Sequence, residues 1–269
     1  MIRWFFYTLV LVVSAPFIAN AALVSRTAGT IDEVLRNASI IIAVAASIFI
    51  VFIVVLSAVI KTKTATLKKA LFIAFLVGIV GPTAFFIGST VYINRMSESG
   101  GPVHWHADFQ IYACGQPIKL AGPTSKLSNK VGSAVLHHHS DNRIHLEGVV
   151  GHVKDFELQD FFATIGGELT ETSFTIPTES GIRLLKNGVP CADTSPGTWQ
   201  VFVYKQDKHD PSVFYQEKLA SYTNYVLSPY EQIPPGDCII MEFDAVKART
   251  EHLCTFYKIE LDKGTISIK

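Results

Sequence analysis

Two long apolar runs near the start of the chain constrain its fold more than any other feature. They cover residues 38–60 and 70–93, and neither contains Asp, Glu, Lys or Arg. A helix of about 20 apolar residues crosses a hydrocarbon core that is about 30 Å thick. The runs therefore predict a transmembrane hairpin within residues 22–96, with the lipid bilayer as its partner.

The segment before the hairpin, residues 1–21, has the features of a secretory signal peptide. Arg3 precedes an apolar stretch over residues 4–18, and Ala19 and Ala21 form an A-x-A-like cleavage site. The alternative is a first membrane helix that is not cleaved. The sequence leaves both interpretations open.

The connection between the two apolar runs predicts the orientation of the hairpin. It contains Lys61, Lys63, Lys68 and Lys69 and no acidic residue. Short loops that are rich in Lys and Arg stay on the cytoplasmic side. We therefore expect a multi-pass protein of the plasma membrane whose C-terminal part is exoplasmic, and a retained first helix gives the same placement.

The remainder of the chain predicts one soluble domain. Residues 97–102 are rich in Gly, Ser and Pro and predict a linker, and residues 103–269 form the domain. Lys plus Arg and Asp plus Glu both number 23, so the formal net charge is zero. Without a basic field or a basic tract, a nucleic-acid partner is not expected.

The cysteines agree with an exoplasmic location. All four follow the hairpin, at Cys114, Cys191, Cys238 and Cys254. An even number of cysteines in an oxidising compartment predicts two disulfides, and three pairings are possible. Metal ligation is the alternative, but the chain has no C-x-x-C pair.

The periodicity of the domain predicts an α+β fold with a mainly antiparallel or mixed sheet and one short helix. Apolar residues at i, i+3, i+4 and i+7 predict the helix over residues 158–165. The tail, residues 256–269, predicts a hairpin around Gly264. Strands are expected over residues 106–114, 117–120, 144–150, 199–204 and 238–243, with a possible short one at 225–227.

Part of this pattern resembles the β-grasp fold of ubiquitin-like sulfur carriers. The likeness rests on residues 160–165, on the Asn187-Gly188 hairpin signal with the residues before it, and on residues 236–241. The chain ends at Lys269 without the di-glycine tail of those carriers. Their chemistry is therefore not carried over.

Seven of the nine histidines fall between His104 and His152. Imidazole is the commonest metal ligand in proteins. Because residues two apart in a strand share a face, His104 and His106 project together, and so do His145 and Glu147. Two such pairs predict a divalent metal site.

The triplet of residues 137–139 has two interpretations. It is either a solvated loop or a source of one or two further ligands. Imidazole and carboxylate suit a copper or zinc ion, and the absence of a nearby Met disfavours Cu(I). Asp108 and Asp141 are available as further ligands or as acceptors that orient an imidazole. The candidate ligands are therefore His104, His106, His137, His139, His145 and Glu147.

The order of these motifs resembles a group of uncharacterised exported or membrane-anchored bacterial and archaeal proteins. That group has an H-x-H start, an H-T-H-D-x-x-G-x-I-H-x-E segment and an F-T-L-x-x-F-F motif. Here the matching residues lie between His104 and Val189, with one extra residue before Asp141. The resemblance implies a shared site and names no reaction.

These features predict a membrane-anchored, non-enzymatic domain that binds copper or zinc. The alternative is an accessory subunit of a larger membrane complex, in which the histidines are structural and small residues such as Gly78 and Gly81 allow close helix packing. A metal-dependent enzyme is less favoured because the chain has no G-x-S-x-G and no H-E-x-x-H motif.

Overall fold

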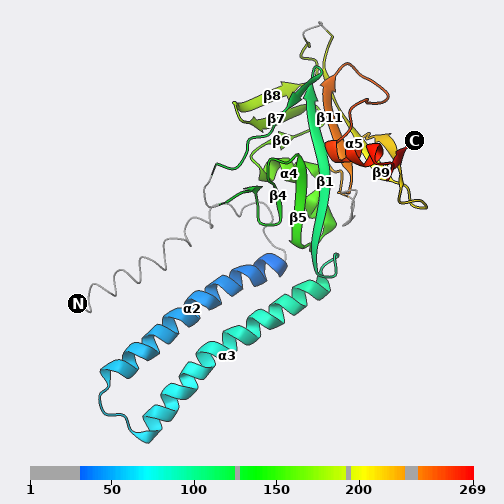
Figure 1. Ribbon diagram of the computed structural model, residues 1–269. Helices are drawn as coiled ribbons and strands as arrows, with labels where there is room; N and C mark the ends of the chain where they lie inside the picture. Colours follow the sequence, from blue (N-terminus) through cyan, green and yellow to red (C-terminus); the bar gives the residue numbers. More distant parts are fainter. Residues whose placement is uncertain (1–30, 125–127, 192–194, 228–235) are drawn as a thin grey trace. The chain divides into compact units, whose positions relative to one another are not determined.

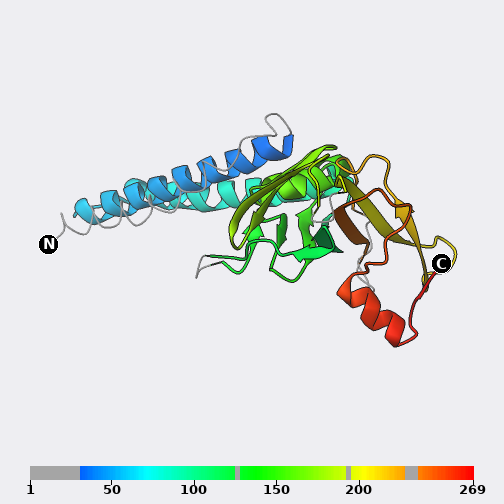
Figure 2. The ribbon, with the colours of Figure 1, turned by 90° about the horizontal axis from the view of Figure 1, so that it is seen from above.

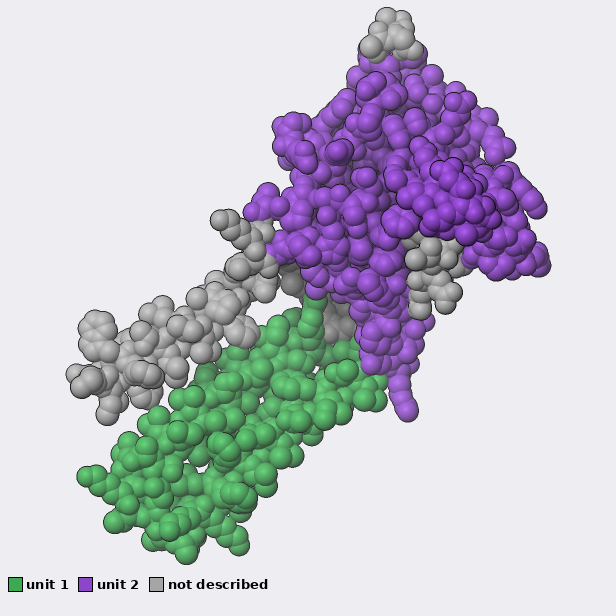
Figure 3. Space-filling view, in the orientation of Figure 1, with its two compact units in different colours: residues 1–93 green, residues 94–269 purple. Residues whose placement is uncertain are grey.

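The computed structural model describes residues 31–124, 128–191, 195–227 and 236–269 of the chain. The chain divides into two compact units, residues 1–93 and residues 94–269 (Figure 3). The predicted signal peptide or first membrane helix, residues 1–21, lies outside the described residues.

The first unit contains two long antiparallel helices, α2 (Ile31–Val59) and α3 (Ala65–Met96) (Figure 1). Both are long and apolar enough to cross a membrane, and the predicted spans fall within them except for residue 60, which follows α2. The helices pack at Gly78, where an added Cβ would lie 3.1 Å from Cδ1 of Phe49, whereas Gly81 faces open space. Large apolar side chains cover the outer faces, which fits contact with lipid.

The second unit is built on a mixed nine-stranded sheet. At its centre, β1 (Pro102–Ala113) runs parallel to β11 (Cys238–Asp244) and antiparallel to β5 (Arg143–Val149). The order is β12-β10-β9-β11-β1-β5-β4-β3, and β2 pairs with β1. The other strands are β2 (Gln116–Ile118), β3 (Val131–Gly132), β4 (Leu136–His138), β9 (Thr198–Gln206), β10 (Val213–Lys218) and β12 (Ser267–Ile268).

One face of this sheet carries the larger hydrophobic core. Every second residue of β1, from Trp105 to Ala113, is buried there. The face is covered by α4 (Leu158–Thr164), which follows a short 3-10 helix, η2 (Val153–Phe156), and whose Phe161 ring lies 5.7 Å from that of Phe109. A small antiparallel sheet joins this core and consists of β6 (Glu168–Leu169), β7 (Ser173–Thr178) and β8 (Gly181–Lys186).

The opposite face carries α5 (Thr255–Asp262), as the view from above shows (Figure 2). Tyr257 of this helix is fully buried in a second core with Ile240 and Phe202. The even-numbered residues of β1, including His104 and His106, lie on this face. The alternation of β1 therefore places its odd-numbered apolar residues in the larger core and its two histidines on the face that carries α5.

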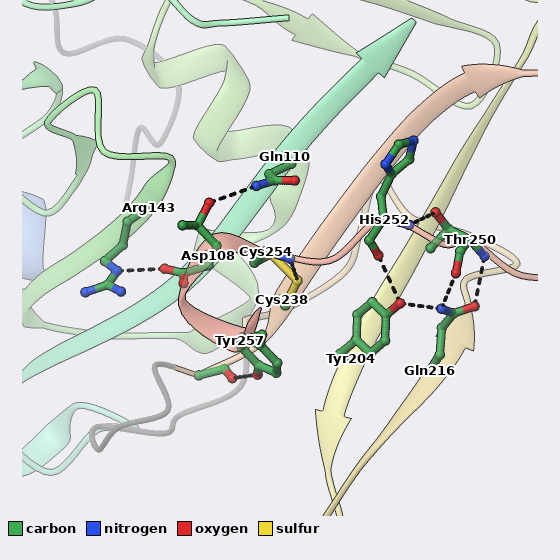
Figure 4. The surroundings of a disulfide bond; sticks show 12 residues. Asp108, Gln110, Arg143, Tyr204, Gln216, Cys238, Thr250, His252, Cys254 and Tyr257 are labelled. Atoms are coloured by element: carbon green, nitrogen blue, oxygen red, sulfur yellow. Dashed lines mark hydrogen bonds and ion pairs between the residues drawn. A yellow bond between two sulfur atoms is a disulfide. The ribbon is translucent and has the colours of Figure 1, made fainter. Parts of the chain in front are cut away.

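Both predicted disulfides are present. Cys114 bonds to Cys191, and Cys238 bonds to Cys254. The second bond joins β11 to the residue that precedes α5 (Figure 4). With two disulfides and two long apolar helices, the chain has the features of a membrane or secreted protein with its cysteines outside the cytoplasm.

The α+β class, the mixed sheet and the helix predicted over residues 158–165 are confirmed. The strands expected at 106–114, 117–120, 144–150, 199–204 and 238–243 are present with bounds shifted by a few residues, whereas 225–227 contributes a single bridge at Val226. The likeness to β-grasp proteins stays a prediction.

Two expectations about turns are wrong. The tail is not a hairpin, because residues 255–262 form α5 and Gly264 ends that helix with a φ of 72°. The N–H of Gly264 bonds to the carbonyl of Leu261 and that of Thr265 to Glu260, which is the Schellman pattern. The Asn187-Gly188 signal also marks a turn that follows β8, while the β7–β8 hairpin turns at Glu179 and Ser180.

Candidate metal centre

Strand register brings the predicted ligands onto one face of the sheet. In the β1–β5 pair, His104 is opposite Glu147 and His106 is opposite His145. In the β4–β5 pair, His137 is opposite the same His145. Strand β1, which is distant in sequence, and the neighbouring strands β4 and β5 therefore place these side chains in adjacent rows.

His137, His139, His145 and Glu147 form the first of two groups. One candidate ligand atom from each lies within 4.8 Å of the others. Oε1 of Glu147 is 3.8 Å from Nε2 of His137 and 3.9 Å from Nδ1 of His145. The ring of His139 is centred 4.7 Å from that of His145. This group combines three imidazoles with one carboxylate.

His104 and His106 form the second group with His145, again within 4.8 Å. Nε2 of His104 is 3.0 Å from Nε2 of His106 and 3.1 Å from Oε1 of Glu147. The two groups therefore touch at His145 and Glu147, and the structure brings all six predicted ligands together.

The triplet is not a solvated loop. His137 and His138 end strand β4 and are buried, because β4 pairs with both β3 and β5. His137 and His139 face the cluster, whereas His138 lies on the opposite face with its ring 6.1 Å from Phe161. The triplet thus contributes two side chains to the cluster, as the second interpretation predicted.

Buried ring nitrogens without a partner mark the centre of the first group. His137 is 0% exposed, and neither of its ring nitrogens has a hydrogen-bond partner among the described residues. Nδ1 of His145 is also buried and has no hydrogen-bond partner among the described residues. Most buried polar atoms in proteins are paired, so an unpaired imidazole that faces a carboxylate is a place where a cation could bind.

Outer partners orient two of the imidazoles. Nε2 of His145 is 3.0 Å from Oδ2 of Asp141, which leaves Nδ1 free to face Glu147. Nδ1 of His139 is 2.8 Å from the carbonyl oxygen of Asn129. Each contact fixes the ring and its tautomer, as outer partners of metal-ligating histidines do.

The two acids considered as auxiliary residues have different roles. Asp141 orients His145, and burial raises its pKa, but hydrogen bonds from His145 and from backbone N–H groups outweigh burial and hold that pKa below its usual value. Asp108 instead accepts a 2.7 Å hydrogen bond from Nε of Arg143 (Figure 4). Arg143 thus balances the charge of Asp108, and the side chain of Asp108 is not part of the cluster.

Burial disfavours the protonated form of three histidines in the cluster. Burial, together with the neighbouring His145, lowers the pKa of His106 to about 4. Burial, together with Lys130, lowers the pKa of His137 to about 4 as well. Burial also lowers the pKa of His145. Neutral imidazole is the form that binds a metal, so these residues need not lose a proton at neutral pH.

The other histidines lie outside the cluster. His152 is 3.4 Å from Oε1 of Glu98, and His252 stacks on Tyr112 with ring centroids 3.6 Å apart. His209 is exposed in a turn. Sequence reasoning did not identify Asn129, whose backbone carbonyl carries no side-chain signal.

Comparisons with known proteins give no family for this chain: no family model, no curated protein and no solved structure matches it. The resemblance to uncharacterised exported proteins therefore stays a prediction. The function has to be inferred from the residues themselves.

Proposed function

We propose that this chain is a membrane-anchored domain that binds one divalent transition metal ion, Cu(II) or Zn(II), through His137, His139, His145 and Glu147. The observation that carries the proposal is the fully buried, unpaired imidazole of His137, which faces the carboxylate of Glu147 at 3.8 Å. A cation between them would bind both the ring nitrogen of His137 and the carboxylate of Glu147.

The donor atoms agree with this choice of metal. All four cysteines are in disulfides, so thiolate ligands are absent and the cluster offers imidazole nitrogen and carboxylate oxygen. Such ligands suit Zn(II) and Cu(II) more than Cu(I). Bonds of about 2.0–2.1 Å in a tetrahedron place ligand atoms about 3.3 Å apart. Contacts of 3.8 and 3.9 Å need only a small contraction around an ion.

The membrane placement rests on charge and on the apolar helices. The four lysines between α2 and α3 favour a cytoplasmic loop. The domain then lies on the exoplasmic side of the plasma membrane, where its two disulfides are stable. Such a protein would capture metal outside the cell or hold it for a neighbouring complex.

Calorimetric titration of the full chain in detergent, after treatment with a chelator, tests the proposal. We expect Zn(II) or Cu(II) to bind tighter than about 10 µM, which corresponds to about 7 kcal/mol. His139→Ala should weaken this binding by more than the roughly 10- to 100-fold that loss of an outer partner costs. His209→Ala removes an exposed histidine outside the cluster and should leave it unchanged. Failure of both metals to bind at 10 µM would rule the function out.

A second candidate function is an accessory subunit of a membrane complex. Strand β8 is an edge of the small sheet, and its Ile182 and Leu184 are 74% and 50% exposed. Exposed apolar side chains on an edge strand are typical of a surface that pairs with another chain. Co-purification in mild detergent distinguishes the two functions, because an accessory subunit should retain a stoichiometric partner and lose it in Ile182→Lys.

A further inference from the structure

We propose that the cluster holds two ions, with a second metal position formed by His104 and His106 and with Glu147 bridging the two positions. This inference rests on the proposed function, and it predicts a dinuclear centre in place of a single site. The first position belongs to His137, His139 and His145, which offer three imidazole ligands on the buried side.

The second position is defined by two short contacts of His104. Its Nε2 atom is 3.0 Å from Nε2 of His106 and 3.1 Å from Oε1 of Glu147. Both distances are close to the roughly 3.3 Å that separates ligand atoms around a tetrahedral ion. His104 thus already has the spacing of a metal ligand to both His106 and Glu147, and His145 lies within 4.8 Å of the two histidines.

Hydrogen bonds alone explain these contacts poorly. An imidazole nitrogen has one position in the ring plane, which holds either a proton or a lone pair. Nε2 of His104 can therefore make at most one linear hydrogen bond, although it has two partners at about 3 Å. A cation satisfies both contacts, because the nitrogens and the carboxylate then all face it with lone pairs.

His145 belongs to the first position. Its Nε2 atom is taken by Asp141 at 3.0 Å, and its free Nδ1 faces Glu147 at 3.9 Å. His145 also lies within 4.8 Å of His104 and His106, but its free nitrogen is used at the first position, so the second position takes Glu147, whose Oε1 is 3.1 Å from Nε2 of His104. The same oxygen of Glu147, Oε1, is 3.1 Å from His104 and 3.8 Å from His137, so this carboxylate lies beside both positions and can bridge two ions. Two ions held in this way lie about 3.5–4 Å apart.

The two positions differ in exposure and in charge. His137 is fully buried, whereas the side chain of His104 is 61% exposed, and so the second ion has room for water. Two divalent ions carry four positive charges. The cluster offers two carboxylates against them, Glu147 between the ions and Asp141, which contacts His145. We therefore expect the first ion to bind tightly and the second to bind more weakly and to exchange with solvent.

The test is the metal stoichiometry of the full chain in detergent, measured by elemental analysis and by titration with Zn(II). The wild-type chain should bind two ions per chain in two steps. His104→Ala/His106→Ala should bind one ion, with the affinity of the tight step changed less than about threefold. Both side chains are at least partly exposed, so the variant should fold, and His104→Asn/His106→Asn provides a second polar replacement. His152→Ala/His209→Ala is the matched control and should still bind two.

Glu147→Gln tests the bridge, because it should weaken both steps, whereas the His104/His106 variant affects only the second. With Cu(II), two ions about 4 Å apart couple magnetically. The wild-type chain should then give fewer than two uncoupled spins by electron paramagnetic resonance, and the His104→Ala/His106→Ala variant should give one.

Three results would overturn the dinuclear centre. One is a single ion per chain in the wild type, whether or not the double variant retains it. Another is two ions in the His104→Ala/His106→Ala variant. The third is two fully uncoupled Cu(II) spins. Absence of any bound ion has a different meaning, because it rejects the proposed function itself as well.

Discussion

At the scale of single residues, His137 is held in a state that a protein interior rarely tolerates. Its imidazole is fully buried and has no hydrogen-bond partner among the described residues. An unpaired buried polar group costs about 1–3 kcal/mol. Binding an ion would remove that cost. The metal-free domain should therefore be less stable than the loaded one.

The same burial predicts how the stability of the metal-free chain depends on pH. The pKa of His137 is about 4 in the folded domain and 6.5 without the fold. Between these values the unfolded chain binds a proton that the folded domain does not. The free energy of unfolding should thus fall as the pH is lowered from 6.5 to 4, by up to about 1.4 kcal/mol per pH unit for this residue.

Thermal unfolding of the metal-free chain at several pH values measures this effect. The free energy of unfolding of His137→Asn should decline less steeply with falling pH than that of the wild type. The decline for His209→Ala should equal that of the wild type. Equal slopes for the wild type and His137→Asn would show that the side chain of His137 is protonated as easily in the folded state as in the unfolded one.

Asp141 should act through His145. Asp141→Asn keeps the shape of the side chain but removes the charge that accepts the proton of Nε2. Loss of such an outer partner typically costs about 10- to 100-fold in metal affinity. We expect a loss of that size in a Zn(II) titration, and none for the exposed Asp262→Asn. An affinity unchanged by Asp141→Asn would mean that His145 does not need this partner.

Residue periodicity predicted much of the candidate site. Alternation along a strand was sufficient to pair His104 with His106 and His145 with Glu147. It could not decide between loop and strand for the triplet, because β4 is three residues long and is held by pairing with β3 and β5. Short strands are stabilised by their neighbours more than by their own sequence.

At the scale of elements, the site depends on the register between β1, β5 and β4. A shift of one residue in β5 would turn His145 and Glu147 to the apolar face. The sequence shows which residues share a face within one strand, but not which strand lies beside it. That information comes from packing of the core, where Ile144 and Leu146 are buried.

The end of α5 shows why the tail was predicted wrongly. Asp262-Lys263-Gly264 is compatible with a hairpin turn and with a helix cap, and local sequence does not separate them. Burial of Tyr257 against the sheet selects the helix. The positive φ of Gly264 then serves the Schellman cap rather than a hairpin.

Gly264→Ala should destabilise the domain by about 1 kcal/mol, because a left-handed conformation is unfavourable for a residue with a Cβ. Gly264→Asn should lose less stability than Gly264→Ala, since Asn tolerates this conformation better. Denaturant unfolding of the two variants gives the comparison. Equal stability of wild type and Gly264→Ala would contradict the cap, and so would a larger loss for Asn than for Ala.

At the scale of the whole molecule, the chain combines a hairpin of two long apolar helices with a disulfide-bonded domain that carries a histidine cluster. The two units were predictable from hydropathy because membrane spans have a strong signal in sequence. The pairing of the cysteines was not predictable, since it depends on which strands become neighbours. Cys114 and Cys191 are 77 residues apart in sequence and meet only in the fold.

Protease access to intact cells without a wall or outer membrane tests the orientation. A tag after Lys269 should be removed from outside, whereas a tag in the lysine loop between α2 and α3 should be cut only after the membrane is opened. The reverse pattern would place the domain in the cytoplasm and would leave its two disulfides without an oxidising compartment.

Anomalous X-ray diffraction at the zinc or copper edge, on crystals of the loaded chain, tests the central claim most directly. We predict an anomalous peak at about 2.0–2.2 Å from ligand atoms of His137, His139, His145 and Glu147. No peak at these four residues in crystals that contain the metal, or peaks bound only by residues outside the cluster, would contradict it.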